Sequence, residues 1–137
     1  MADVAYCRFV PIPKISDERG SLSFLQPGPV LQFDIRRVYY LYDVPPGGER
    51  GAHGHRALRQ LMIAVSGYLE VECDDGRHRK IFRLDSPDRG LYICPMIWRR
   101  LSNFRPGTVC MVLASDVYDE KDYFRNYGDF LAEALKE

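Results

Sequence analysis

The sequence predicts an all-β protein, a sandwich or barrel of short strands, followed by one short C-terminal helix. The apolar residues fall in short runs that are rich in β-branched and aromatic side chains, as strands are. Nine prolines and eleven glycines are spread between these runs, where they mark turns. No helical pattern separates one run from the next, so the strands are expected to follow one another directly.

Each expected element is bounded by turn residues. Strands are expected at residues 37–43, 60–66, 68–73, 81–84, 90–94 and 109–114. The sequence Asp74-Asp75-Gly76 predicts a hairpin, because Asp and Gly tolerate the positive φ of tight turns. Residues 45–48 and 105–107, rich in Pro and Gly, predict loops. Helix-forming residues predict the C-terminal helix at 129–136.

Length and composition narrow the possible organisation and partners. A chain of 137 residues suits one domain over residues 1–137. Lys plus Arg and Asp plus Glu number 19 each, so the basic excess of a nucleic-acid-binding protein is missing. No apolar run reaches the ~18 residues of a membrane span, and the N-terminus lacks signal-peptide features. The four cysteines form no CxxC pair, which predicts buried, reduced thiols in a cytoplasmic protein.

Two of the three histidines form the motif His53-Gly54-His55. Side chains at positions i and i+2 of a strand point to the same face, so both imidazoles can enter one pocket. Taken alone, the spacing is equally compatible with a solvated pair. A strand-like run from Gln60 and a second motif at 90–95 favour a functional pair.

This layout resembles the two motifs of the cupin superfamily, small jelly-roll barrels with a ligand pocket at the mouth. Metal-binding cupins follow the His pair with a Glu and take a third His from the second motif. Here those positions hold Arg59 or Gln60, and Arg99 or Arg100. None of these side chains is a good ligand for zinc, iron or manganese. We therefore expect no metal and a proton-transfer role for the histidines, which titrate near neutrality.

A closer resemblance is carried by several motifs in order, at residues 35–40 (IRRVYY), 50–55 (RGAHGH), 90–93 (GLYI), 112–115 (VLAS) and 118–123 (YDEKDY). Together with Trp98 they resemble the sugar-nucleotide 3,4-ketoisomerases, which act on dTDP-4-keto-6-deoxyglucose in the synthesis of 3-amino sugars. The resemblance implies a metal-free and cofactor-free cupin. It also implies a homodimer in which an N-terminal strand crosses to the partner.

The implied reaction moves a ketone from C-4 to C-3 of the sugar through an enediol, which requires a base at C-3 and a proton source at C-4. The resemblance assigns these tasks to the His pair. We expect His53 to be the C-3 base and His55 the second proton-transfer group, although the residues leave the reverse order open. The acidic residues Asp119, Glu120 and Asp122 are interpreted as structural, near the start of a helix.

The substrate-binding residues expected from the resemblance are Arg19, Arg37, Tyr39, Arg50, Gln60, Trp98 and Arg99. The planar guanidinium group of Arg donates paired hydrogen bonds that suit a diphosphate or an enolate oxygen. Arg37 and Arg50 are the candidates for the diphosphate, and Arg19 and Arg99 for the sugar. For Tyr39 and Trp98, core packing remains an equally good interpretation.

Two other functions remain open from the sequence. One is a non-catalytic cupin that binds a sugar nucleotide. The other is a 3/5-epimerase of the same substrate, which we disfavour because we expect no carboxylate beside the histidines. The resemblance also implies two subgroups, with Arg and His at two pocket positions for galacto products, and Tyr and Arg for gluco products. Arg19 matches the first subgroup and Arg99 the second. Arg99 stands where the galacto type has an imidazole, and guanidinium does not readily release a proton. We therefore expect the gluco product, dTDP-3-keto-6-deoxyglucose.

Overall fold

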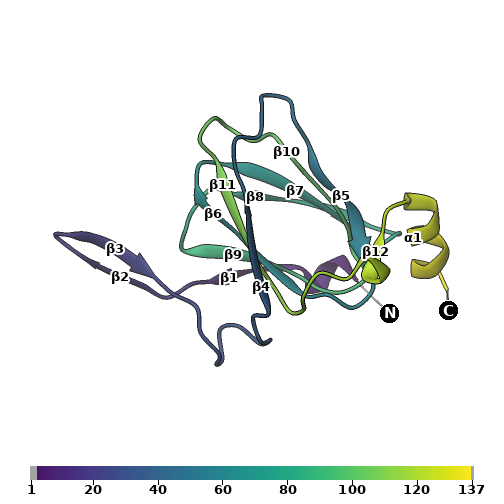
Figure 1. The fold of residues 1–137 in the computed structure, drawn as a ribbon, viewed down its shortest axis with the longest axis horizontal. Coiled ribbons are helices and arrows are strands. Elements are labelled where there is room, and N and C mark those ends of the chain that lie inside the picture. The colour runs from purple at the N-terminus through teal and green to yellow at the C-terminus, as the bar shows by residue number, and fades with distance from the viewer. Residues whose placement is uncertain (1–2, 137) are drawn as a thin grey trace.

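The computed structural model describes residues 3–136, and they form two five-stranded sheets that face each other (Figure 1). The first sheet has the spatial order β1 (Arg8–Pro11), β9 (Arg89–Ile93), β6 (Gln60–Ser66), β11 (Val109–Ala114) and β4 (Arg37–Leu41). The second has the order β12 (Tyr123–Phe124), β5 (Arg50–His55), β10 (Trp98–Ser102), β7 (Leu69–Asp74) and β8 (Arg79–Leu84). Neighbouring strands in both sheets are antiparallel.

The main core lies between the two sheets. Met62 and Val112 of the first sheet and Leu69, Val71 and Leu101 of the second belong to one buried cluster. Side chains alternate along a strand, so the neighbours of Met62 on β6 point the other way. They join a second apolar cluster on the outer face of the first sheet. The expected all-β architecture is confirmed.

The hairpin of β2 (Lys14–Asp17) and β3 (Gly20–Ser23) projects away from both sheets (Figure 1). All eight of its strand residues are exposed, including Ile15 and Leu22. Arg19 lies in its turn, where the guanidinium bonds the Asp17 carboxylate at 2.7 Å. An isolated two-stranded hairpin is at best marginally stable in water, so this one gains from a covering surface.

The C-terminal region contains a 3₁₀ turn, η2 (Glu120–Asp122), and the helix α1 (Tyr127–Ala134). The helix begins two residues earlier than the sequence predicted, because the Asn126 side chain accepts a hydrogen bond from Asp129 N and caps it. Its fully buried Phe130 packs against Trp98 and Phe124 of the second sheet. A similar short turn, η1 (Val4–Tyr6), precedes β1.

The predicted strands are found with ends shifted by a few residues, and β7 and β8 form the expected hairpin. The expected strands did not include β1, β2, β3, β10 and β12, and β5 was anticipated only through the spacing of its His pair. In β10, two arginines hide the apolar alternation, because one of them is buried. The four cysteines are buried free thiols, as expected. Among residues 3–136, none of the helices has the length and apolar character needed to span a bilayer.

Candidate active site

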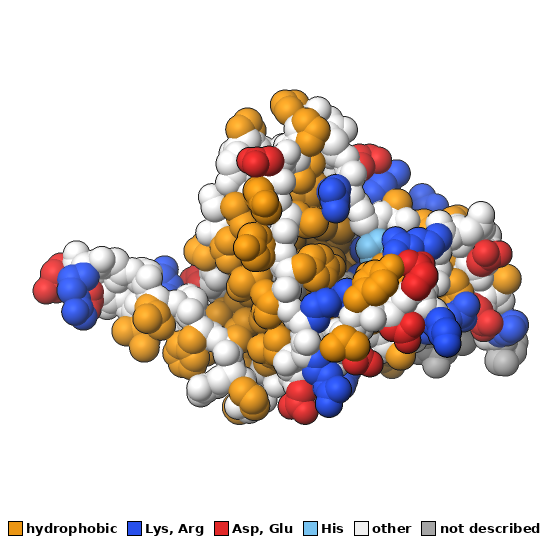
Figure 2. All heavy atoms as spheres, viewed as in Figure 1, with side chains coloured by type: hydrophobic (Ala, Val, Ile, Leu, Met, Phe, Trp, Pro, Cys, Tyr) orange, Lys and Arg blue, Asp and Glu red, His pale blue; other side chains and the backbone are white. Residues whose placement is uncertain are grey.

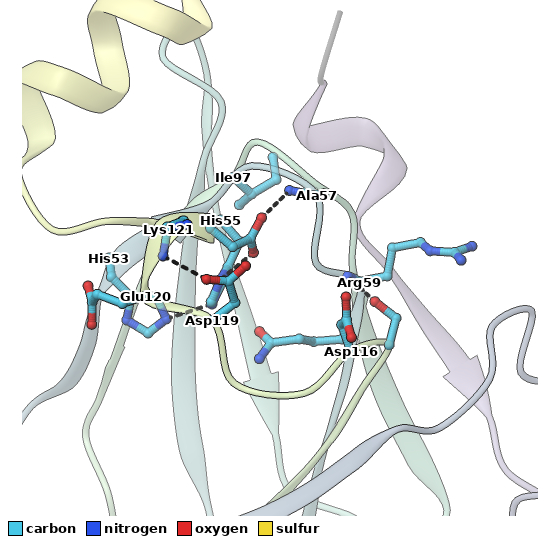
Figure 3. A network of polar contacts seen from close by, with 12 residues as sticks. His53, His55, Ala57, Arg59, Ile97, Asp116, Asp119, Glu120 and Lys121 are labelled. Atoms are coloured by element: carbon cyan, nitrogen blue, oxygen red, sulfur yellow. Dashed lines mark hydrogen bonds and ion pairs between the residues drawn. The ribbon is translucent and has the colours of Figure 1, made fainter.

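Strand β5 holds His53 and His55 on one face, as the sequence predicted. Their Nε2 atoms lie 3.1 Å apart, and their rings are perpendicular, at an interplanar angle of 89° (Figure 3). The ring of Tyr123, on the adjacent β12, lies 4.3 Å from the His55 ring and 5.1 Å from the His53 ring. The two imidazoles therefore form one hydrogen-bonded unit.

Gly54 between the two histidines permits the close approach of α1. A Cβ atom at this position would lie 3.1 Å from the Phe130 ring and 3.3 Å from the Ile97 carbonyl. Phe130 is itself fully buried. The small residue therefore lets the helix close the back of β5 while both imidazoles face the interior.

Asp122 is the main residue of the candidate site that the sequence analysis did not predict. The Nδ1 atom of His55 lies 3.0 Å from Oδ2 of Asp122, whose other oxygen, Oδ1, accepts from Ala57 N at 2.8 Å. The expectation that no carboxylate accompanies the histidines is therefore wrong, and Asp122, which was interpreted as structural, contacts the pair. No local pattern could reveal the pair, because 67 residues separate Asp122 from His55.

Both histidines are neutral at pH 7. Burial, followed by the positive charge of Arg99, lowers the pKa of His53 to about 3 and that of His55 to about 2. A neutral imidazole has one N–H and one lone pair, so each ring can both donate and accept a proton. This state suits general acid–base catalysis.

Arg99, Gln60 and Tyr39 form a hydrogen-bonded chain across the interior. The fully buried Arg99 donates to the Ile97 carbonyl through Nε, at 3.2 Å, and to Oε1 of Gln60 through Nη1. The Gln60 amide donates in turn to the Tyr39 hydroxyl at 3.0 Å. That hydroxyl therefore accepts one hydrogen bond and keeps its own proton available for another acceptor.

A cavity of about 340 Å³ opens beside His53. Arg37, Arg50 and Arg125 bring three positive charges to its wall, and Tyr39 is also part of the lining. The buried Nε of Arg37 has no hydrogen-bond partner within residues 3–136. In Figure 2, a histidine side chain is visible in a hollow beside basic side chains. The cavity therefore combines bases with groups that attract an anion.

A second, smaller cavity of about 240 Å³ lies beside His55. Its lining includes Asp122, and it shares Arg37 and Tyr123 with the first cavity. Arg36, the neighbour of Arg37, is exposed. Of these two adjacent arginines, only Arg37 lines the cavities.

The structure brings together His53, His55, Arg37, Tyr39, Arg50, Gln60 and Arg99. Within this one chain it does not bring Arg19 to them, since that side chain is 86% exposed on the projecting hairpin. Trp98 is not among the residues that line the two cavities. Its indole packs on Tyr127 and Phe130, because neighbours on a strand point to opposite faces and Arg99 takes the inner one.

The sequence analysis did not predict Tyr123 and Arg125 as site residues, and it interpreted Glu120 as structural. Arg125 lines the larger cavity and pairs with Glu120 at 2.8 Å. The only signal was the aromatic and charged run at 118–125, which resembles a helix start when it is considered alone. Folding brings this run beside β5, where Tyr123 pairs with His55.

The positions where metal-binding cupins have further ligands hold neutral Gln60 and cationic Arg99, which hydrogen-bond each other. Within the described part of the chain, no three His, Cys, Asp or Glu side chains are grouped to hold a metal ion. That the protein needs no metal remains a prediction, to be tested by elemental analysis.

Comparison with known proteins places the chain among sugar-nucleotide isomerases. It is 41% identical over 123 residues to a curated TDP-4-oxo-6-deoxy-alpha-D-glucose-3,4-oxoisomerase from Aneurinibacillus thermoaerophilus, covering 90% of this chain and 88% of the relative.

Two solved structures extend the comparison. One is the 3,4-ketoisomerase QdtA from Thermoanaerobacterium thermosaccharolyticum, a variant in complex with TDP-4-keto-6-deoxyglucose. It has a TM-score of 0.91 and 37% identity, with 93% of each chain covered. The other is WlaRB, a TDP-quinovose 3,4-ketoisomerase from Campylobacter jejuni, with a TM-score of 0.88 and 42% identity over 92% of this chain and 97% of that one.

These matches confirm the expected cupin-like fold, and a family model covers nearly the whole chain. That model, described as "FdtA: WxcM-like, C-terminal", matches residues 5–135. The chain therefore belongs to the FdtA family of 3,4-ketoisomerases.

Proposed function

We propose that this protein isomerises dTDP-4-keto-6-deoxyglucose by moving its ketone from C-4 to C-3. The observation that carries the proposal is the pair of neutral, hydrogen-bonded imidazoles of His53 and His55. They adjoin a cavity whose wall contains three arginines. The reaction transfers protons within one sugar and changes no net oxidation state, so acid–base groups with oxygen-binding groups suffice.

His53 is the base in this proposal, because it lines the larger cavity with the arginines. It removes the proton from C-3, and the C–H electron pair forms the C-3/C-4 double bond. The C-4 oxygen receives the displaced carbonyl electrons and is protonated to give the enediol. Loss of the proton from the C-3 hydroxyl and protonation of C-4 then leave the ketone at C-3. His55, bonded to His53, is the second proton-transfer group.

Arg37 and Tyr39 are the proposed groups that stabilise negative charge on the enediolate oxygens. The unpartnered buried Nε of Arg37 and the free hydroxyl proton of Tyr39 supply donors before the substrate arrives. Preorganised donors of this kind are typically worth about 10²–10³-fold in rate. Gln60 donates a hydrogen bond to the Tyr39 hydroxyl, and Arg99 donates one to Gln60. In this proposal, these two predicted binding residues therefore act indirectly, by positioning Tyr39.

Arg50 is proposed to bind the diphosphate, as the sequence predicted, together with the newly found Arg125. Both lie on the wall of the larger cavity. Guanidinium groups bind phosphate oxygens through two parallel hydrogen bonds. Trp98 is left out of the proposed site, because its packing on α1 accounts for its position.

We further propose that the protein is a homodimer in which the N-terminal hairpin packs on the partner. An apolar groove on the outer face of the first sheet is lined by residues such as Ile63, Met111 and Leu113. The exposed Ile15 and Leu22 of the hairpin are apolar as well, and Figure 2 shows apolar side chains on this face. In such a dimer, Arg19 would act in the partner's site, which explains its distance from its own histidines.

For the configuration at C-4, we propose the gluco product. The buried guanidinium of Arg99 does not readily release a proton, so protonation of C-4 is expected from the His53 and His55 side. The likeness to WlaRB points the same way. Coupling the reaction to a 3-aminotransferase and measuring the H-4 couplings by NMR tests this. A small H-3/H-4 coupling, which indicates an axial O-4, would contradict it.

The biosynthesis of 3-amino-3,6-dideoxy sugars for lipopolysaccharide or other glycans is the proposed context, in the cytoplasm. Support for that compartment comes from the four buried free thiols, which are typical of reducing conditions. The 3/5-epimerase is no longer excluded by a missing carboxylate, because Asp122 accompanies His55. The family assignment nevertheless favours ketoisomerisation.

The decisive experiment incubates the protein with dTDP-4-keto-6-deoxyglucose in D₂O and follows the sugar by NMR. The proposal requires a new C-3 ketone and a new bond from C-4 to hydrogen or deuterium. Deuterium at C-5 would identify an epimerase. Binding of the sugar nucleotide with no exchange of any sugar hydrogen would identify a non-catalytic protein.

A further inference from the structure

We propose that Asp122 is a positioning residue that fixes the proton of His55 on Nδ1 and thereby sets the direction of the hydrogen bond between the two histidines. This inference rests on the proposed function for its meaning in catalysis. It rests on geometry alone for the proton positions. Asp122 does not reach the larger cavity, so it acts through His55.

Both carboxylate oxygens of Asp122 have hydrogen-bond partners. Its Oδ1 accepts from Ala57 N at 2.8 Å, and its Oδ2 faces His55 Nδ1 at 3.0 Å. The backbone is held as well, because Arg56 N donates to the Asp122 carbonyl at 2.9 Å. Figure 3 shows the contact to Ala57 beside the two histidines. The carboxylate is thus fixed in position relative to the end of β5.

This arrangement determines which nitrogen of each ring carries a proton. A carboxylate only accepts hydrogen bonds, so His55 must donate from Nδ1. In a neutral ring, Nε2 of His55 then has the lone pair. Because that atom lies 3.1 Å from Nε2 of His53, His53 must donate from Nε2, and its own lone pair is on Nδ1.

The other groups around His55 do not change which ring nitrogens carry the protons. Arg99 of β10, Arg37 of β4 and Arg125 near β12 all disfavour an added positive charge, and the Tyr123 ring lies 4.3 Å from the His55 ring, tilted by 58°. The rings therefore stay neutral at pH 7, and Asp122 orders their protons without ionising them.

The consequence is a directed path for one proton. When Nδ1 of His53 takes the proton from C-3, His53 becomes an imidazolium and passes its Nε2 proton to Nε2 of His55. His55 is then protonated on both nitrogens, and its charge lies against the Asp122 carboxylate. In reverse, His55 returns a proton to Nε2 of His53, and Nδ1 of His53 then gives its proton to C-4. No proton, electron or co-reactant is gained or lost over the cycle.

The variant Asp122→Asn tests the inference. The Asn side chain has the same shape as Asp, but its amide reverses the direction of the hydrogen bond to His55. Ala57 N still requires an oxygen acceptor, so the amide NH₂ group is directed at His55. Nδ1 of His55 must then accept, its proton moves to Nε2, and the bond to His53 reverses. In a serine protease triad, replacing the Asp by Asn changed the tautomer of the histidine, left the geometry intact and lowered kcat about 10⁴-fold.

Asp119→Asn is the matched control. Asp119 lies in the same segment, and its side chain accepts from Lys121 N at 3.0 Å to cap the 3₁₀ turn. Asn caps such turns equally well, so the control removes one carboxylate charge nearby without touching His55. Both variants are expected to unfold thermally close to the wild type.

Two readouts separate positioning from a structural role. Nitrogen-15 NMR of labelled histidine is simple here, because the chain has three histidines and His78→Asn removes the exposed one. We expect the Nδ1–H form of His55 in the wild type and in Asp119→Asn, and the Nε2–H form in Asp122→Asn. In kinetics, we expect Asp122→Asn to lower kcat about 10²–10⁴-fold, by analogy with other misplaced tautomers, with KM little changed.

An Nε2–H form of His55 in the wild type, or a wild-type kcat in Asp122→Asn, would overturn the inference. So would an equal loss of kcat in Asp119→Asn. If the wild type isomerises no sugar nucleotide, the proposed function fails, and the tautomer measurement still decides the role of Asp122.

Discussion

At the scale of single residues, the proposed chemistry depends on two imidazoles that contact each other and stay uncharged. Burial and the positive charge of Arg99 keep His53 and His55 neutral. Asp122 faces one nitrogen of the pair, and the larger cavity adjoins the other ring. A base that is already deprotonated at pH 7 requires no preliminary proton loss before it reacts.

The variants His53→Asn and His55→Asn are expected to lose most of the isomerase activity. Asn preserves polarity and removes the titrating nitrogen, and general acid–base groups typically contribute about 10²–10⁴-fold. Turnover in the D₂O assay and thermal unfolding are the measurements. A wild-type rate in both variants, with the fold intact, would contradict proton transfer by this pair.

Stability is expected to fall as the pH is lowered from 7 to 5. The unfolded histidines take up protons as the pH passes below about 6.5, whereas the folded ones resist until about pH 3. The unfolded state therefore binds more protons in this window, and the free energy of unfolding decreases as the pH falls. At pH 5 the loss is up to about 2 kcal/mol for each histidine.

Urea unfolding of the wild type and of the double variant His53→Asn/His55→Asn at pH 7 and pH 5 measures this effect. The double variant should show a clearly smaller difference between the two pH values. An identical pH dependence in both proteins would show that the histidines are not the cause.

At the scale of elements, the C-terminal segment packs against the second sheet, whereas the N-terminal hairpin projects from the molecule. β12 and α1 dock on the second sheet, through Phe130 and the pairing of Tyr123 with His55. This docking places Asp122 beside the site. The β2–β3 hairpin leaves all eight of its strand residues exposed, Ile15 and Leu22 among them.

The double variant Ile15→Asp/Leu22→Asp is expected to weaken the dimer while leaving each chain folded. Both side chains are already exposed in the single chain, at 63% and 58%, so the charges cost little unless a partner covers them. Light scattering at micromolar concentration and circular dichroism are the measurements. Ile81→Asp, on the other sheet and 57% exposed, is the control. A wild-type protein that runs as a monomer would contradict the proposal.

At the scale of the whole molecule, the two sheets enclose a site built from distant parts of the sequence. Tyr39 comes from β4, the histidines from β5, Gln60 from β6 and Arg99 from β10. Of the residues expected where metal-binding cupins have further ligands, Gln60 and Arg99 hydrogen-bond each other in the interior. This arrangement leads to a prediction about the purified protein.

The purified protein is expected to contain no stoichiometric transition metal and to keep its activity in the presence of a chelator. The buried guanidinium of Arg99 disfavours a divalent cation by charge, and the Gln60 amide is a weak ligand. Elemental analysis and the isomerase assay with and without chelator are the measurements. About one metal per chain, with activity lost on chelation, would contradict the prediction.

The sequence by itself determined the fold class and the centre of the site. Strand periodicity is local, so the runs around Gln60 and Val109 predicted their strands, and the i, i+2 spacing placed His53 and His55 on one face. The resemblance supplied Arg37, Tyr39, Arg50, Gln60 and Arg99, which the structure gathers around them.

Only the tertiary structure decided which groups complete the site. Asp122 meets His55 across 67 residues, and Arg125 enters the cavity wall through the docking of the C-terminal segment. Trp98 and Arg99 are neighbours in sequence, but the pleat of β10 directs one to the helix and the other to the interior. Local patterns record periodicity along the chain, whereas these contacts depend on how separate segments pack together.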